Sequence, residues 1–387
     1  MPIINSILDS DKYKFSMQQL IFHQHPNVTA EIEFKCRDKD VDLSPYSNQI
    51  LKQIQHLSSL SLTPEEYSYL TSKEIYKKDY LNFLSKYKFN LNDLIFTHKP
   101  FSIKVKGLWK NIILWEIPIL SIVSEVYFNN TYPMSKLQII DGQKRLLDKI
   151  QMILELNDQT FKFTDFGTRR RRAFLWQKFV VQKLSKFLPV NFLGTSNVHL
   201  AHILGLEDSG TMAHEFLQAY QVLAPLEKFQ KIALEDWFKE YSGNLGIALT
   251  DVIGFDAFLE EFDENLAKEY IGLRHDSGCP YAWGDKAIKF YEKLNINPKT
   301  KTLIFSDGLT MASAIEIHKY FKGRIKTQIN GIGTHLTNDF SFKPLNIVMK
   351  MTSCNDLPVA KLSDSPGKEM CKDQNFINKL KKIRNLK

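Results

Sequence analysis

Hydrophobic and polar positions in the first part of the chain follow two different periods. Residues 11–25 repeat apolar side chains about every 3.6 positions, which predicts a helix. Residues 28–34 and 101–105 instead alternate apolar and polar side chains, as half-buried strands do. The apolar run 112–120 predicts a further strand, with Pro118 at its edge or end. We therefore expect helices and a small antiparallel sheet in this part of the protein.

From about residue 160 onward, short apolar runs alternate with helical stretches. Nearly every run ends in Gly, Thr, Ser, Asp or Arg, and the runs cover residues 191–193, 245–249, 270–273, 302–305, 325–329 and 345–349. Such alternation predicts a parallel sheet, and polar residues at successive strand ends predict a barrel with a site on that rim. Because fewer than eight clear strands can be recognised, we expect the barrel to be irregular.

The fold class that follows is α/β: an irregular (β/α) barrel-like domain plus a smaller α+β domain built largely from the N-terminal half. We expect the α+β domain in residues 1–150, which the tail of the chain could rejoin. The barrel-like catalytic domain is expected in residues 151–370. A chain of 387 residues is long enough for one large unit and one smaller one.

Composition and charge narrow the class of protein only a little. With 43% hydrophobic and 24% charged residues the chain is typical of soluble globular proteins, and its formal net charge of +8 favours anionic partners without selecting one. The N-terminus lacks the pattern of a signal peptide, and no window approaches the ~20 apolar residues of a membrane span. The scattered cysteines argue against a structural zinc site and suit a reducing compartment. We therefore expect a cytoplasmic protein without a membrane partner.

The segment Ser209–Glu215 holds the most informative single residue, His214. Gly210 and Thr211 break the preceding segment, and Thr211 is suited to cap a helix that begins at Met212. His214 would then lie in the first turn, where the positive end of the helix disfavours imidazolium and leaves a neutral, nucleophilic ring. The same helix end would stabilise a phosphoryl group on that ring. The alternative is a histidine that only hydrogen-bonds near a helix start.

Six more segments carry hydroxyl, amide, acidic or basic residues, in all but one case together with Gly, near apolar runs. They are Phe163–Arg172, Gly194–Asn197, Leu249–Asp251, Gly272–Gly278, Leu303–Gly308 and Gly331–Thr334. Together with Ser209–Glu215 these motifs resemble the bacterial nicotinate phosphoribosyltransferases, of the type II phosphoribosyltransferase family. The resemblance runs from Leu8–Tyr13 to Leu362–Lys368, which is nearly the whole chain.

This resemblance implies an ATP-dependent enzyme of the ligase and glycosyltransferase type, acting in NAD biosynthesis. It would make nicotinate mononucleotide and pyrophosphate from nicotinate and phosphoribosyl pyrophosphate, with Mg²⁺ as cofactor and ATP as co-substrate. His214 would carry the phosphoryl group as phosphohistidine, and Asp251 would orient its ring. The chain has no P-loop motif, so ATP would share the site of the ribosyl donor. The family also implies a homodimer with a shared active site.

The resemblance also assigns roles to residues in the N-terminal half and in the arginine run. Phe166 would stack on the pyridine ring, and Arg169 and Arg171 would face the anionic substrates, whereas Arg170 and Arg172 would be solvated. Tyr13 would close the nicotinate pocket of the neighbouring subunit. Without the family, the arginine run could equally be a basic surface patch or a nucleic-acid contact, and the tyrosine a core residue.

Further substrate-binding residues are expected at the strand ends. Two residues apart on one strand, Arg274 and Asp276 would point the same way, either as an ordinary ion pair or, by resemblance, toward nicotinate or phosphate and toward ribose or magnesium. The family implies that the ribose phosphate part of the donor is held by the Gly-containing turns, in which Gly lets the backbone approach closely. With Thr211, the substrate-binding residues there are Ser306, Asp307, Gly331, Gly333 and Thr334.

The acid is the expected substrate, and a relative that uses nicotinamide or quinolinate is the alternative. Nicotinamide-using relatives carry an acidic residue at the position of Ser196, where this chain offers no carboxylate to bind an amide NH₂. A nucleic-acid-binding protein is a third interpretation. It lacks interleaved aromatic residues and any recognisable module, so no nucleic-acid partner is expected.

Overall fold

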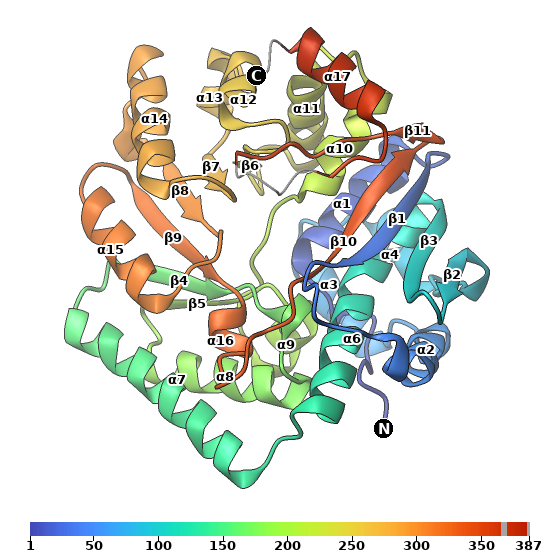
Figure 1. Cartoon of the computed structure of the whole chain (residues 1–387). Coiled ribbons are helices and arrows are strands. Elements are labelled where there is room, and N and C mark those ends of the chain that lie inside the picture. Colours follow the sequence, from blue (N-terminus) through green and yellow to red (C-terminus); the bar gives the residue numbers. More distant parts are fainter. Residues whose placement is uncertain (365–369, 385–387) are drawn as a thin grey trace. The chain divides into compact units, whose positions relative to one another are not determined.

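The computed structural model describes residues 1–364 and 370–384, and the chain forms two compact units. Unit 1 comprises residues 1–27, 32–210 and 332–350, and unit 2 comprises residues 28–31, 211–331 and 351–387. Figure 1 labels most elements of both. The predicted domain boundary near residue 150 stays a prediction, because these units are defined by internal contacts and change over at residue 210.

Unit 1 contains helices α1 to α9 and the short helix α16. Their bounds are α1 Lys12–Gln24, α2 Ser47–His56, α3 Pro64–Thr71, α4 Lys78–Ser85, α5 Trp109–Ile112, α6 Glu116–Thr131, α7 Lys136–Leu156, α8 Phe174–Phe187, α9 Val198–Leu204 and α16 Thr334–Thr337. Its strands are β2 Leu94–Thr97, β3 Ser102–Leu108, β4 Lys162–Asp165 and β5 Phe192–Thr195, with most of β1 Thr29–Cys36 and the first half of β10 Ile347–Cys354.

Unit 2 contains the remaining long helices and most of the parallel strands. The helices are α10 His214–Leu223, α11 Phe229–Tyr241, α12 Phe255–Glu261, α13 Glu264–Glu269, α14 Pro280–Lys293, α15 Met311–Phe321 and α17 Gln374–Ile383. The strands are β6 Ile247–Leu249, β7 Gly272–His275, β8 Thr302–Phe305, β9 Thr327–Ile332 and β11 Leu357–Pro358.

Strands β6 to β9 pair in parallel and in chain order, with the helices α12 to α15 in the connections between them. Leu249 of β6 pairs with Arg274 of β7, which pairs with Ile304 of β8, so the strands end at nearly the same level. Because the carboxyl ends of parallel strands share one edge of a sheet, the polar residues that follow each strand are brought together. The predicted gathering of polar residues at successive strand ends is therefore present in this unit, and their role as a site stays a prediction.

Close packing of β7 against β8 explains one of the glycines in this sheet. A Cβ at Gly272 would lie 1.8 Å from the carbonyl oxygen of Thr302, which no side chain can tolerate. The glycine therefore permits the backbone pairing that fixes the height of β7 and of the residues that follow it.

The run at residues 345–349 forms a strand as expected, but not in the parallel sheet. β10 lies beside β1: in unit 1 the N–H of Arg37 donates to the oxygen of Asn346, and in unit 2 the N–H of Asn355 donates to the oxygen of Thr29. Within unit 1, β3 and β2 extend this sheet by antiparallel pairing, from Leu94 opposite Val105 to Thr97 opposite Ser102. The tail of the chain does therefore return to a strand near the N-terminus.

The expectation of a strand at residues 112–120 is wrong, because this segment belongs to α5, a 3₁₀ turn and α6. Almost every side chain of α6 up to Val126 is buried, so the helix is apolar all round and shows no 3.6-residue period. Pro118 is the third residue of α6, in the first turn, where a missing N–H is tolerated. The stretch Trp109–Thr131 is also long and apolar enough to cross a membrane by composition, contrary to the sequence estimate, and it is 83% buried within the protein.

Candidate active site

His214 is the first residue of α10, and its ring is placed at the start of that helix. The expected position in the first turn is confirmed, but the cap is not Thr211: the N-cap is Ala213, which makes no side-chain hydrogen bond. The helix therefore begins two residues later than the sequence indicated. Thr211 is buried in the loop before it.

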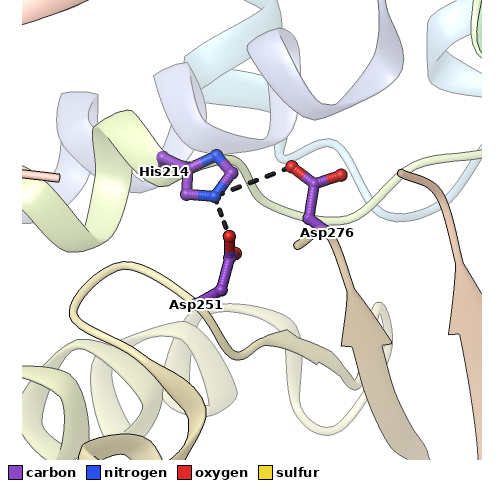
Figure 2. Close-up of side chains that lie close together, drawn as sticks. All are labelled: His214, Asp251 and Asp276. Atoms are coloured by element: carbon purple, nitrogen blue, oxygen red, sulfur yellow. Dashed lines mark hydrogen bonds and ion pairs between the residues drawn. The ribbon is translucent and has the colours of Figure 1, made fainter. Parts of the chain in front are cut away.

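Two carboxylates from neighbouring strand ends meet the same nitrogen of the His214 ring. Nε2 lies 2.8 Å from Oδ1 of Asp251, which follows β6, and 3.6 Å from Oδ2 of Asp276, which follows β7. Figure 2 shows both contacts converging on this atom. Since two oxygen acceptors surround Nε2, that nitrogen carries the proton, and Nδ1 keeps its lone pair.

Burial and a nearby cation hold the ring neutral. Only 4% of His214 is exposed, and its pKa is lowered to about 4. Burial is the largest cause of this lowering, and the positive charge of Lys361 is the next. The charges of Asp251 and Asp276 raise the pKa and oppose both. The sequence argument attributed neutrality to the helix end, whereas the structure supplies desolvation as the larger cause. At pH 7 the imidazole is therefore neutral and donates Nε2–H to Asp251.

Asp251 is held in its charged form by three donors. Burial alone would raise the pKa of this carboxyl, but His214, then Lys361 and the hydroxyl of Ser277, hold it well below the usual range. Ser277 Oγ donates to Oδ2 at 2.7 Å, and Lys361 Nζ lies 3.2 Å from the same oxygen. Both oxygens of Asp251 are thus engaged, and its orientation toward His214 is fixed. The predicted pairing of Asp251 with His214 is present in the structure.

Arg274, Asp276 and Ser306 form a second cluster beside the first. The guanidinium of Arg274 lies 3.5 Å from Asp276 Oδ1, donates through Nε to Ser306 Oγ at 3.1 Å, and donates through Nη1 to the carbonyl oxygen of Met212 at 3.1 Å. Ser306 Oγ donates in turn to Asp276 Oδ1 at 2.8 Å. The expectation that Arg274 and Asp276 point the same way is confirmed, and the arginine also ties the loop before His214 to the strand ends.

Asp307 and Gly331 complete the carboxyl edge of this sheet. Asp307 follows Ser306 at the end of β8, and Gly331 is the fifth residue of β9. Their predicted contacts with the ribosyl donor stay predictions.

His214, Asp251 and Asp276 could hold a cation on distance alone, because one ligand atom from each lies within 4.8 Å of the others. The chemistry does not fit Mg²⁺, which prefers six oxygen ligands in an octahedral arrangement. Here one of the three atoms is a nitrogen, and both carboxylates already contact a lysine or an arginine. A magnesium ion would therefore have to enter with the phosphates of a substrate rather than bind to these groups.

In unit 1 the arginines of residues 169–172 are buried and exposed in a different pattern from the one predicted. Arg171 is fully buried in a bidentate pair with Asp9, at 2.6 and 2.8 Å, so in this structure it faces a carboxylate of its own chain and not an open site. Arg172, expected to be solvated, is also buried and donates to one side-chain and two backbone oxygens. Arg169 keeps 35% of its side chain exposed, 3.7 Å from Glu116, so unlike Arg171 it is not enclosed within the protein.

Phe166 follows β4 and lies against the segment that carries Gly333 and Thr334. Its N–H donates to the oxygen of Ile332 at 2.9 Å, and a Cβ at Gly333 would lie 3.3 Å from its carbonyl oxygen. The preceding Asp165 is buried, which raises the pKa of its carboxyl to about 6, and it accepts from the backbone N–H two residues on. Phe166, Gly333 and Thr334 are thus brought together within unit 1. Tyr13, the second residue of α1, is half-buried in the same unit, and its role in a neighbouring subunit stays a prediction.

The sequence analysis missed several residues that build these clusters. Lys361 and Ser277 hold Asp251, Met212 anchors Arg274, and Asp9 neutralises Arg171. Ser277 lies within the Gly272–Gly278 motif and Asp9 within Leu8–Tyr13, so both were within reach. Lys361 stands just before the Leu362–Lys368 motif, but nothing in its spacing indicates a partner 110 positions earlier.

The fold and this site together define an α/β enzyme with a neutral histidine and two aspartates at the carboxyl edge of a parallel sheet. Two families match the chain: the nicotinate phosphoribosyltransferase (NAPRTase) family over residues 161–386 and the NAPRTase N-terminal domain over residues 8–124. The chain belongs to the nicotinate phosphoribosyltransferase family.

Individual relatives agree over nearly the full length. The nicotinate phosphoribosyltransferase of Buchnera aphidicola subsp. Schizaphis graminum is 44% identical, covering 98% of this chain and 96% of the relative. That of Chromobacterium violaceum is 46% identical, covering 99% of this chain and 97% of the relative. The crystal structure of nicotinate phosphoribosyltransferase from Vibrio cholerae superposes with a TM-score of 0.95 at 37% identity, covering 100% of this chain and 94% of that one. The predicted α/β fold class is confirmed: the chain has a sheet with parallel strands and an antiparallel sheet, and it matches solved structures of this family.

Proposed function

We propose that this protein joins nicotinate to phosphoribosyl pyrophosphate to give nicotinate mononucleotide and pyrophosphate, and that ATP hydrolysis drives the reaction through a phosphohistidine at His214. Family membership supports the substrates and a place in NAD biosynthesis. The observation that carries the coupling is the contact of His214 Nε2 with Asp251, 2.8 Å, on a ring that burial keeps neutral.

The phosphoryl step uses the nitrogen that the carboxylates leave free. The lone pair of Nδ1 attacks the γ-phosphorus of ATP, an N–P bond forms, and the P–O bond to ADP breaks. The ring gains positive character as it is phosphorylated, and Asp251 stabilises that charge through the Nε2 proton. Because phosphorylation adds about 1.5–2 negative charges, the start of α10 and the nearby cations favour the product.

The phosphoribosyl step then takes place beside the phosphorylated ring. The pyridine nitrogen of nicotinate forms a bond to ribose C1, and the bond from C1 to pyrophosphate breaks through an oxocarbenium-like state. By the family resemblance, Arg274 of unit 2 meets an anionic group; within unit 1, Phe166 stacks on a pyridine ring and Arg169 meets an anion. Water finally cleaves the N–P bond of the phosphohistidine and returns a neutral His214.

Mg²⁺ is proposed as the cofactor that arrives with the substrate phosphates, where it neutralises charge on the leaving group. We also propose a homodimer in which Tyr13 of one subunit closes the pocket of the other. The free cysteines suit a reducing compartment, and we propose a cytoplasmic location.

The coupling is tested by His214→Asn with His318→Asn as its matched control. His318 is equally buried in unit 2, on α15, and has no proposed role. Intact mass after incubation with Mg-ATP should rise by one phosphoryl group in the parent protein and in His318→Asn, with no gain in His214→Asn. Pyrophosphate release should lose its ATP stimulation in His214→Asn but keep slow turnover. Undiminished stimulation in that variant would refute the assignment.

Substrate choice and the shared site need separate measurements. Nicotinate, nicotinamide and quinolinate compared in one assay should give turnover with the acid alone, and comparable rates with nicotinamide would favour the alternative. Mixing Tyr13→Ala subunits with His214→Asn subunits should restore ATP-coupled activity, because each hybrid dimer would contain one intact site. No recovery would contradict a site shared between subunits.

A further inference from the structure

Lys361 is a buried cation to which the reaction described above assigns no individual role. Its side chain is 7% exposed, and its Nζ lies 3.2 Å from Oδ2 of Asp251, on the side of the carboxylate opposite to His214. Bringing a lysine into such a position costs desolvation free energy, which an ordinary surface lysine would not incur. The position therefore calls for an explanation.

The backbone around Lys361 is fixed by contacts on both sides of it. Ala360 donates to and accepts from the side-chain amide of Gln221 at 2.7 and 2.8 Å, and Leu362 donates to the carbonyl oxygen of Val252 at 2.8 Å. Lys361 itself pairs with Met370 through two backbone hydrogen bonds. The backbone of Lys361 is thus fixed, and its buried side chain extends from there to Asp251.

The segment is also tied to the helix and the strand ends that carry the reacting groups. Gln221 lies seven residues after His214 on α10, which is two helical turns, so it shares a face with the histidine. The N–H of Asp364 donates to Ser277 Oγ, the hydroxyl that hydrogen-bonds Asp251. Ala360 therefore contacts the helix that carries His214, and Asp364 contacts the hydroxyl that holds Asp251.

The charges that face this pair are few. Asp251 and Asp276 contact the His214 ring, Arg274 contacts Asp276, and Lys361 contacts Asp251. The carboxyl of Asp364 lies further out, near α12. Among the described residues of unit 2, Lys361 is the cation in ion-pair contact with Asp251.

We propose that Lys361 is a positioning residue for His214: it keeps Asp251 ionised and the ring neutral, and it offsets the negative charge that phosphorylation adds beside the two carboxylates. This inference rests on the proposed function. Removing the cation would let the imidazole retain a proton more readily and would leave the phosphohistidine next to an unbalanced carboxylate.

The test compares Lys361→Met, which keeps the length but loses the charge, with Lys361→Arg, which keeps the charge. Lys301→Met is the matched control, since Lys301 is also a buried lysine of unit 2 but donates to backbone carbonyls away from the site. Nitrogen-15 NMR of the His214 ring, assigned with His214→Asn, gives its titration without any need for activity. Phosphohistidine after incubation with Mg-ATP is measured by intact mass.

We expect the ring of the parent protein to stay neutral down to pH 5. In Lys361→Met its titration should move up by about one pH unit, and the phosphohistidine level should fall at least tenfold. Lys361→Arg should keep both properties near those of the parent. Lys301→Met should lower the melting temperature without moving the titration.

Two results would overturn the proposal. One is a Lys361→Met protein that folds and shows unchanged titration and phosphorylation, which would leave the phosphohistidine mechanism intact and remove only Lys361 from it. The other is the absence of phosphate on the parent protein, which would refute the proposed coupling and this inference with it. Should Lys361→Met fail to fold, Gln221→Ala serves in its place, because it removes the hydrogen bonds that hold the backbone next to Lys361. This variant should shift the titration of His214 in the same direction by a smaller amount. The absence of any shift would equally overturn the proposal.

Discussion

Replacing Asp251 by Asn is the sharpest perturbation of the site, because it keeps the size of the side chain and changes the hydrogen bonds that the side chain can accept and donate. The carboxylate has one oxygen 2.8 Å from His214 Nε2, and its other oxygen accepts from Ser277 and lies 3.2 Å from Lys361. An asparagine has a single oxygen, and the two donors on the far side favour placing it there. Its NH₂ then faces Nε2, which must become an acceptor, so the ring proton moves to Nδ1 and the proposed nucleophile is blocked.

The size of the effect follows from this change of tautomer. The same swap in Ser-His-Asp enzymes costs about 10⁴ in rate, which corresponds to about 5.5 kcal/mol of barrier at 1.36 kcal/mol for each factor of ten. We expect the phosphorylation of His214 in Asp251→Asn to fall by about 10³ to 10⁴ on this basis. The protein should also lose about 3 kcal/mol of stability, because the buried Lys361 loses its counter-ion.

The assay is rapid-quench measurement of the phosphohistidine formed from labelled ATP, run with urea unfolding of the same samples. Ser277→Ala is the control, since it removes one hydrogen bond from an uncharged donor to the same carboxylate, at 2.7 Å, but leaves the charge of the carboxylate. Its phosphorylation should fall only about tenfold, in line with a contribution of about 1.5 kcal/mol from a hydrogen bond to a charged group. A folded Asp251→Asn protein that is phosphorylated within threefold of the parent rate would show that this carboxylate does not set the tautomer.

Three further predictions follow from other features. Arg171→Met leaves the carboxylate of Asp9 buried without its counter-ion and should cost about 3–5 kcal/mol of unfolding free energy, measured in urea. A loss below about 1 kcal/mol would mean that this ion pair is not buried in solution. Because burial, followed by a lysine charge, lowers the pKa of His214 to about 4, its contribution to stability is complete above pH 6.5 and is lost as the pH falls toward 4. His214→Asn should therefore lose about 2 kcal/mol less than the parent between pH 7 and pH 5, and equal losses would contradict a neutral ring. Gly272→Ala should cost about 3 kcal/mol of unfolding free energy, because its Cβ would lie 1.8 Å from a β8 carbonyl oxygen. Gly205→Ala is the control, since that glycine has open space around it, and it should cost about 1 kcal/mol. Similar losses of stability for the two variants in thermal unfolding would refute the steric argument.

The sequence predicts the parallel strands well because each is a short apolar run between helical stretches. The run 302–305 coincides with β8, and the runs near residues 248 and 272 locate β6 and β7 within two residues. The residues that follow these runs form the site, since chain connectivity alone brings successive strand ends to one edge. The resemblance paired Asp251 with His214 without a structure, whereas the contact of Asp276 with His214 was not predicted.

The errors have physical causes as well. A helix buried on every side, such as α6, carries no periodic pattern, so residues 112–120 could not be distinguished from a buried strand. The start of α10 was misplaced by two residues because Thr211 has the side chain of a cap but not the position. Arg172 and Lys361 were misjudged or missed because a single sequence shows their charge but not the distant oxygens that compensate it.

The composition of unit 1 has a consequence for how the protein is made. This unit needs residues 1–27 and also residues 332–350, so it cannot be completed until nearly the whole chain has left the ribosome. Asp9 must wait for Arg171, 162 positions later, before its charge is matched. We therefore expect unit 1 to stay incomplete and partly exposed for most of translation, so that chaperones increase the yield of folded protein. We also expect a fragment ending near residue 150 to aggregate instead of folding as an N-terminal domain.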